Sequence, residues 1–107
     1  HKKKELKIFL DSIKLITNGY KITSCWVNKV TGEDLCWHQH PDVDLSIVYY
    51  LENKSNMGTM FKESDTKVTI KECPQNSLLT FDSKLVHSSP LHLPEERYSI
   101  AIDVIRK

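Results

Sequence analysis

Hydrophobic residues recur every three or four positions at the start of the chain and follow a strand-like pattern in most of the remainder. Over residues 3–17 (KKELKIFLDSIKLIT) the apolar positions with helical spacing are Leu6, Phe9, Leu10, Ile13 and Ile16. In an α-helix these side chains share one face, and the following Asn18-Gly19 is a typical helix end. The pattern predicts one amphipathic helix over residues 3–17.

Beyond residue 20 the chain consists of short segments rich in β-branched and aromatic residues, separated by turn residues. The predicted strands are 20–30 (YKITSCWVNKV), 35–40 (LCWHQH), 45–51 (LSIVYYL), 59–61 (TMF), 67–73 (KVTIKEC), 77–81 (SLLTF) and 98–105 (YSIAIDVI). Segment 45–51 is apolar enough to be covered on both faces, whereas 67–73 alternates between apolar and polar residues. One helix followed by about seven or eight strands predicts a mainly β fold, an antiparallel barrel or jelly roll.

The composition fits one small globular domain. A chain of 107 residues, 39% hydrophobic and 27% charged, is expected to form a single core over residues 1–107, with the barrel over residues 20–105. Fifteen basic and 14 acidic side chains give a formal net charge of +1, which offers no clear electrostatic footprint for nucleic acid or an anionic membrane. No apolar run is long enough to span a bilayer.

The three cysteines indicate a reducing compartment. Cys25, Cys36 and Cys73 form no CxxC motif and leave an odd thiol over, so we expect free thiols and a cytoplasmic protein. Because the sequence begins at His1 rather than Met, we also expect it to be a piece of a longer chain. Its abundance of lysine and isoleucine is typical of an AT-rich genome such as that of a phage.

Three histidines form the candidate metal site. His38 and His40 lie two apart in a predicted strand, so their side chains point to the same face. His87 follows the predicted strand 77–81, and imidazoles bind Fe, Zn, Cu or Ni. The alternative is that these are ordinary surface histidines, which is what we expect of His1 and His92.

Arg97 adds a second chemical feature ten residues after His87. Strand alternation puts Arg97 and Ser99 on the same side at the start of the last strand, where a guanidinium can bind a carboxylate bidentately. A metal site beside an inward arginine fits an α-keto dicarboxylate, held by the metal at one end and by the arginine at the other. The alternative is a surface ion pair of Arg97 with Glu95, Glu96 or Asp103.

Taken in order, the motifs resemble the Fe(II)/2-oxoglutarate-dependent oxygenase superfamily, and within it a subgroup of small bacterial and phage-type oxygenases. The resemblance covers about residues 20–105. It is carried by Trp26-Val27-Asn28, Gly32, His38-Gln39-His40-Pro41, Ser46-Ile47-Val48-Tyr49-Tyr50-Leu51, Phe61, Pro74, His87 and Arg97-Tyr98-Ser99-Ile100.

The resemblance implies a double-stranded β-helix that uses Fe(II), 2-oxoglutarate and O2 to hydroxylate a substrate, with release of CO2 and succinate. Ascorbate is a further candidate cofactor. By the same resemblance, the metal ligands and catalytic centre are His38, His40 and His87. The resemblance also implies that Arg97 and Ser99 bind the distal carboxylate of 2-oxoglutarate. Asn28 and one of Tyr49 or Tyr50, with Tyr50 preferred, would line the cosubstrate pocket.

The sequence departs from the wider superfamily at the second ligand, where most members have His-x-Asp or His-x-Glu. An alternative register, His40-Pro41-Asp42, would restore that motif with Asp42 as a ligand. The spacing of Asn28 and Gly32 before His38, and the strand-disturbing Pro41, favour the register that begins at His38.

Two other interpretations stay open. A cupin-type metalloenzyme also has a β-barrel with a His-x-His pair, and Asp44 would be its acid. A non-catalytic jelly-roll binding or virion module would keep Trp26 and Trp37 as core residues and the histidines as incidental ones. The primary substrate, for which a protein side chain, a small metabolite and a nucleobase are candidates, and the oligomeric state stay open.

Overall fold

The computed structural model describes residues 7, 11, 13–14, 18–30, 37–89 and 96–107. As predicted, the described part is mainly β. Its strands are β1 (Tyr20–Val30), β2 (Leu45–Glu52), β3 (Met57–Ser64), β4 (Lys67–Glu72), β5 (Leu78–Asp82), β6 (His87–Ser88) and β7 (Arg97–Arg106). Only four residues of the helix predicted over 3–17 are described, so that helix stays a prediction. The prediction of a strand over 35–40 is wrong for its described residues, 37–40, which form only an isolated β-bridge at His38 because a single residue pairs there with His87.

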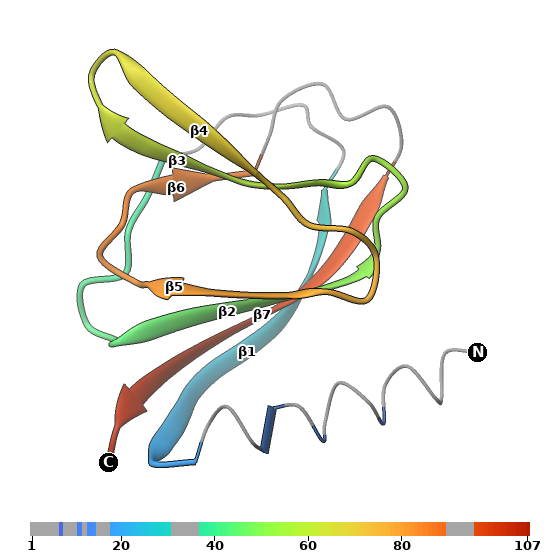
Figure 1. Cartoon of the computed structure of the whole chain (residues 1–107). Helices are drawn as coiled ribbons and strands as arrows, with labels where there is room; N and C mark the ends of the chain where they lie inside the picture. Colours follow the sequence, from blue (N-terminus) through green and yellow to red (C-terminus); the bar gives the residue numbers. More distant parts are fainter. Residues whose placement is uncertain (1–6, 8–10, 12, 15–17, 31–36, 90–95) are drawn as a thin grey trace.

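The strands form two antiparallel sheets. One sheet has the order β1-β7-β2-β5 and the other the order β4-β3-β6, and each neighbouring pair runs antiparallel. Figure 1 shows the sheets as two layers, with β4, β3 and β6 above β5 and β2. Strands β2 and β7 are therefore the two inner strands of the four-stranded sheet.

The two faces of β7 have different surroundings: one packs in the hydrophobic core and the other lines a cavity between the two sheets. The even-numbered residues Ile100, Ile102 and Val104 pack in one buried hydrophobic cluster that also contains Ile13 and the β2 residues Ile47 and Tyr49. Four odd-numbered residues of β7 face the opposite way and line a cavity between the sheets, and these are Arg97, Ser99, Ala101 and Asp103. The period of two therefore supplies both a core and a polar interior from one strand.

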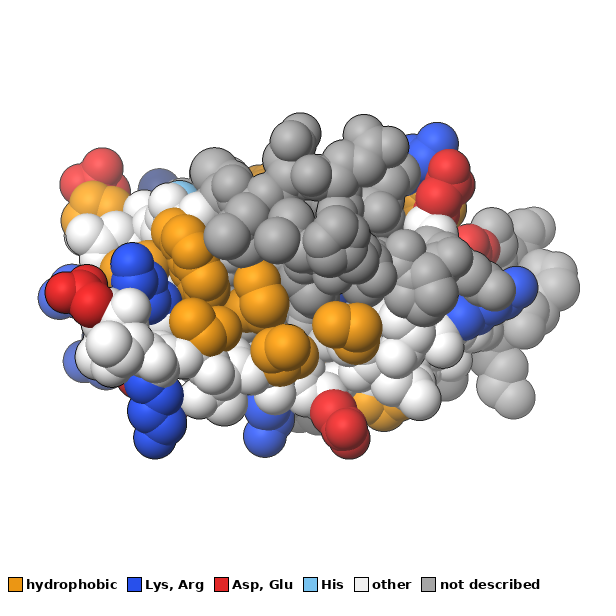
Figure 2. All heavy atoms as spheres, turned by 90° about the horizontal axis from the view of Figure 1, so that it is seen from above, with side chains coloured by type: hydrophobic (Ala, Val, Ile, Leu, Met, Phe, Trp, Pro, Cys, Tyr) orange, Lys and Arg blue, Asp and Glu red, His pale blue; other side chains and the backbone are white. Residues whose placement is uncertain are grey.

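Strand β4 differs from the other strands because all six of its side chains are exposed. The strand prediction from its alternating pattern is confirmed, but the apolar face is not buried within the described chain: Val68 is 49% exposed and Ile70 is 47% exposed. Figure 2 views the molecule from the side of this sheet and shows hydrophobic side chains gathered on this face. Within the described residues, no helix is long and apolar enough to cross a membrane.

Candidate metal centre

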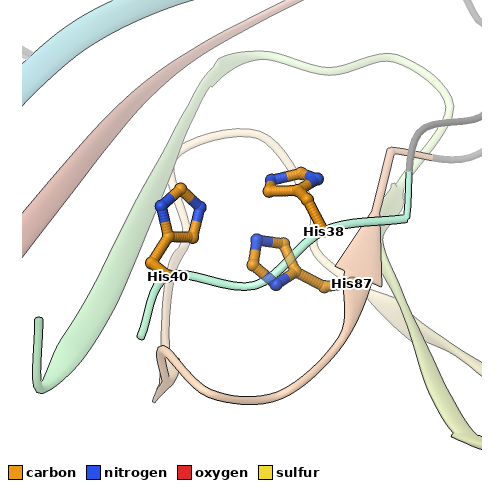
Figure 3. A group of neighbouring side chains, drawn as sticks. All are labelled: His38, His40 and His87. Carbon is orange, nitrogen blue, oxygen red and sulfur yellow. The ribbon is translucent and has the colours of Figure 1, made fainter. Parts of the chain in front are cut away.

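The structure brings His38, His40 and His87 together. Each offers one ring nitrogen to a group in which all three lie within 4.8 Å of one another. Figure 3 shows the rings around a common space, two from one segment and the third from β6. The ring centroids are 4.2 Å apart for His38 and His87, and 5.0 Å apart for His38 and His40. Three imidazoles at these separations can bind one cation.

Backbone hydrogen bonds hold the two histidine segments side by side. His38 N–H donates to the His87 carbonyl at 3.0 Å, and His87 N–H donates back to the His38 carbonyl at 2.9 Å. His40 N–H donates to the Ser83 carbonyl at 2.8 Å. The relative positions of the three side chains are therefore set by an antiparallel bridge between segments far apart in the sequence.

His87 is oriented by its surroundings to act as a ligand through Nε2. Its Nδ1 lies 2.8 Å from the Leu85 carbonyl, and because a carbonyl can only accept, Nδ1 carries the proton. The rings of Phe81 and Phe61 pack against the imidazole, at centroid distances of 4.8 and 6.4 Å. Burial lowers the pKa of His87, which keeps the imidazole neutral and its Nε2 lone pair available near neutral pH.

The predicted cosubstrate residues lie close to the histidines. Three of them, Asn28, Arg97 and Ser99, line the same cavity as the three imidazoles. Tyr50 contacts the site through Arg97, because its ring centroid lies 5.0 Å from the guanidinium carbon of Arg97. Its hydroxyl lies 2.7 Å from the hydroxyl of Thr59, within hydrogen-bond distance. Burial raises the pKa of the Tyr50 hydroxyl, so it stays protonated.

Arg97 is a buried cation, only 3% exposed. Its Nη1 donates to the carbonyls of Met57 and Gly58 at 2.7 and 2.6 Å, and its Nη2 donates to the Ser89 hydroxyl at 3.3 Å. The buried Nε has no hydrogen-bond partner, and no ion pair joins Arg97 to a carboxylate of the described residues. Burial without a counter-ion lowers the pKa of Arg97.

The carboxylates considered as surface partners of Arg97 are placed elsewhere. Glu96 pairs with Lys29 at 3.4 Å, and Asp103 lies beside His40 at 3.4 Å. Glu95 lies outside the described residues. The alternative, a surface ion pair of Arg97 with Glu96 or Asp103, is therefore absent from the described residues, because Arg97 faces the cavity and each of these carboxylates has another partner.

Neither of the alternative acidic residues reaches the histidine group. Asp42 is exposed and does not line the cavity. Asp44 is also exposed, and its carboxylate accepts a hydrogen bond from the backbone N–H of Arg106 at 2.6 Å. The structure thus brings His40 to the other two imidazoles, and it does not bring Asp42 or Asp44.

Asp103 was not predicted to belong to the site, although it lines the cavity and contacts His40. The signal was present in the sequence, because Asp103 continues the alternation of Arg97, Ser99 and Ala101 along the last strand. Aspartate is usually exposed to solvent, so the residue type argued against an interior position despite this alternation.

Gly58 supports the arginine and allows a specific prediction. A Cβ at this position would lie 2.6 Å from the Lys71 carbonyl and would also collide with the Cys73 thiol. We expect Gly58→Ala to cost about 1–3 kcal/mol of unfolding free energy, because two neighbouring strands must separate. Thermal unfolding measures this, with Lys62→Ala as an exposed control on β3. Equal melting temperatures for the two variants would contradict the prediction.

Comparison with known proteins identifies the fold. No protein-family model and no curated protein sequence matches the chain. A 2OG-Fe(II) oxygenase family oxidoreductase from Burkholderia pseudomallei superimposes with a TM-score of 0.69 at 16% identity, over 82% of this chain and 46% of that one. The nickel complex of the non-haem monooxygenase ThoJ superimposes with a TM-score of 0.65 at 15% identity, over 92% of this chain and 49% of that one.

The chain has the fold of the 2OG-Fe(II) oxygenases. It spans about half the length of these two proteins. A cupin-2 domain protein from Shewanella frigidimarina also matches, at 17% identity and a TM-score of 0.48, which is too weak a likeness to bear on function. The predicted resemblance is confirmed for the superfamily fold, and the bacterial and phage-type subgroup stays a prediction.

Proposed function

We propose that this protein is an Fe(II)- and 2-oxoglutarate-dependent oxygenase that hydroxylates its substrate. The observation that carries the proposal is that buried Arg97 lines the cavity of the three imidazoles, with no carboxylate partner among the described residues and with its Nε unpaired. A buried guanidinium without an anion is costly, and a ligand carboxylate in this cavity would offset that cost. An inward cation beside a metal-binding group fits a dicarboxylate that also chelates a metal.

The donor set fits Fe(II). Neutral imidazoles bind Fe(II), as they bind other divalent metals, and His87 is held neutral with Nδ1 occupied and Nε2 available. When bound, the iron would supply the positions at which 2-oxoglutarate and O2 react and the oxidising power for C–H hydroxylation. Three protein ligands leave coordination positions open for these two reactants.

The remaining residues would bind and orient the cosubstrate. Arg97 would hold the distal carboxylate, with the Ser99 hydroxyl as a second donor and Asn28 at the cavity wall. The Met57 and Gly58 carbonyls fix the guanidinium through Nη1, and the Tyr50 ring lies against it. These contacts order Arg97 before a ligand arrives, which lowers the entropic cost of binding.

The two alternatives receive less support. A cupin-type site would need Asp44 at the metal, but this carboxylate accepts the Arg106 N–H at the surface. A non-catalytic jelly-roll module would explain neither the grouping of the three histidines nor the burial of Arg97 without a carboxylate partner among the described residues. The double-stranded β-helix description, the N-terminal helix, ascorbate, a cytoplasmic location and the substrate class (protein side chain, metabolite or nucleobase) stay predictions.

The decisive experiment uses the wild-type protein. Under anaerobic conditions, Fe(II) and 2-oxoglutarate together should produce a weak visible charge-transfer band, and admission of O2 should release succinate and CO2. Glutarate, which lacks the keto group, is the matched ligand control and should produce no band. Iron binding without 2-oxoglutarate binding or turnover would favour the cupin alternative, and failure to bind any divalent metal would contradict both enzyme assignments.

A further inference from the structure

Asp103 is a buried carboxylate built into the sheet beside the histidine group. It is 5% exposed, and its Oδ2 lies 3.4 Å from Nδ1 of His40. Ser46 on β2 donates to its Oδ1 at 2.9 Å, and Ser24 on β1 donates to its Oδ2 at 3.4 Å. Both serines are the direct cross-strand partners of Asp103 in the sheet register. Three adjacent strands therefore fix the position of this carboxylate.

The surroundings of Asp103 contain little to balance its charge. Among the described residues, its carboxylate forms an ion-pair contact with His40 and with no lysine or arginine. Hydroxyl donors reduce the cost of burying a carboxylate, but they carry no positive charge. A metal bound by His40 would supply that charge one imidazole away from Asp103.

We propose that Asp103 is a positioning residue for His40 and provides, through the Nδ1–H of that imidazole, the negative charge that an all-histidine metal site lacks. The inference rests on the metal site of the proposed function. A carboxylate that accepts Nδ1–H fixes the tautomer with the Nε2 lone pair free and makes this nitrogen a stronger donor to a metal. Asp103 itself does not belong to the group of ligand atoms within 4.8 Å.

The test is a double-mutant cycle measured as Zn(II) affinity, because Zn(II) binds imidazole without 2-oxoglutarate or O2. Asp103→Asn keeps the size and the acceptor for Ser46 but turns an amide N–H toward the Nδ1–H of His40. We expect Asp103→Asn to lower Zn(II) affinity roughly 10- to 100-fold. In a His40→Ala background, the same substitution should leave the affinity unchanged.

Ser46→Ala is the matched control, since it removes a neutral partner of the same carboxylate and should change Zn(II) affinity far less. Unchanged affinity in Asp103→Asn would overturn the inference. An equal loss with and without His40 would overturn it as well, because Asp103 would then act on the metal directly or on the fold as a whole.

A second measurement needs no variant that could misfold. In Zn(II)-loaded wild-type protein with ¹⁵N-labelled histidine, NMR should show His40 bound through Nε2, with its Nδ1 proton shifted downfield and protected from exchange. Coordination through Nδ1 would refute the inference. Neither readout uses 2-oxoglutarate, so intact coupling without 2-oxoglutarate turnover refutes the proposed function alone. Turnover without the coupling refutes this inference alone, and a protein that binds no metal refutes both.

Discussion

Replacing Arg97 with methionine is expected to weaken 2-oxoglutarate binding by about 3 kcal/mol, on the order of 100-fold, while Fe(II) still binds. The loss follows from removing a buried cation that faces the cavity and has an Nε free to donate. The histidine group should keep its metal because Arg97 contacts none of its members in the described structure. Anaerobic titration of the Fe(II)-loaded protein, followed by the charge-transfer band, measures the effect.

The control is Arg106→Met, which removes the other arginine of β7 from an exposed position and should leave 2-oxoglutarate affinity unchanged. Arg97→Met also deprives the Met57 and Gly58 carbonyls of a donor, so thermal stability should fall with affinity. Ser99→Ala keeps those contacts, and it should weaken 2-oxoglutarate binding more modestly without loss of stability. Full 2-oxoglutarate affinity in Arg97→Met would contradict the assignment of this arginine to the cosubstrate.

Removal of one imidazole from the histidine group gives the second large effect. His40→Ala should reduce divalent metal affinity at least on the order of 100-fold, beyond the range expected when only a residue behind a ligand is changed. The reason is that His40 offers one of only three imidazole nitrogens in the group. Calorimetric titration with Zn(II) or anaerobic Fe(II) measures the affinity directly.

Asp42→Ala is the matched control for this experiment, because Asp42 is two residues away, exposed and outside the cavity lining. It should bind metal like the wild type. Loss of metal binding in both Asp42→Ala and His40→Ala would favour the His40-Pro41-Asp42 register, in which both residues are ligands, and would require residues 40–42 to rearrange on binding. Metal affinity retained in His40→Ala would contradict both registers.

Much of the β architecture could be predicted from local pattern. Strand 45–51 was expected to be covered on both faces, and β2 lies between β7 and β5 with Ile47, Tyr49 and Tyr50 buried. The alternating 67–73 segment was expected to be a strand, and β4 is one. Its exposure could not be predicted, because alternation fixes which residues share a face but does not supply the element that covers it.

The candidate site could also be predicted only in part, because the sequence pattern gives side-chain directions within a strand but not the neighbouring strands. The shared side of Arg97 and Ser99 follows from strand alternation along β7 and could be read from the sequence alone. The same alternation was applied to His38 and His40, where the structure forms only an isolated bridge at His38. Which strands lie next to these residues does not follow from the sequence. Whether Arg97 faces an external carboxylate or the interior depends on which sheet covers β7, and the sequence offered Glu96 as an equally plausible partner.

The sequence by itself therefore indicated the mainly β class, the three imidazoles and the arginine as candidates for one site, and the residues of β7 that share a face. Only the tertiary structure decided that a backbone bridge places His38 beside His87 and that Arg97 is buried against two carbonyls. It also decided that Asp103, between Ser24 and Ser46, stands behind His40. The physical reason is that side-chain direction is a local property of a strand, whereas counter-charges and hydrogen-bond partners come from strands distant in sequence.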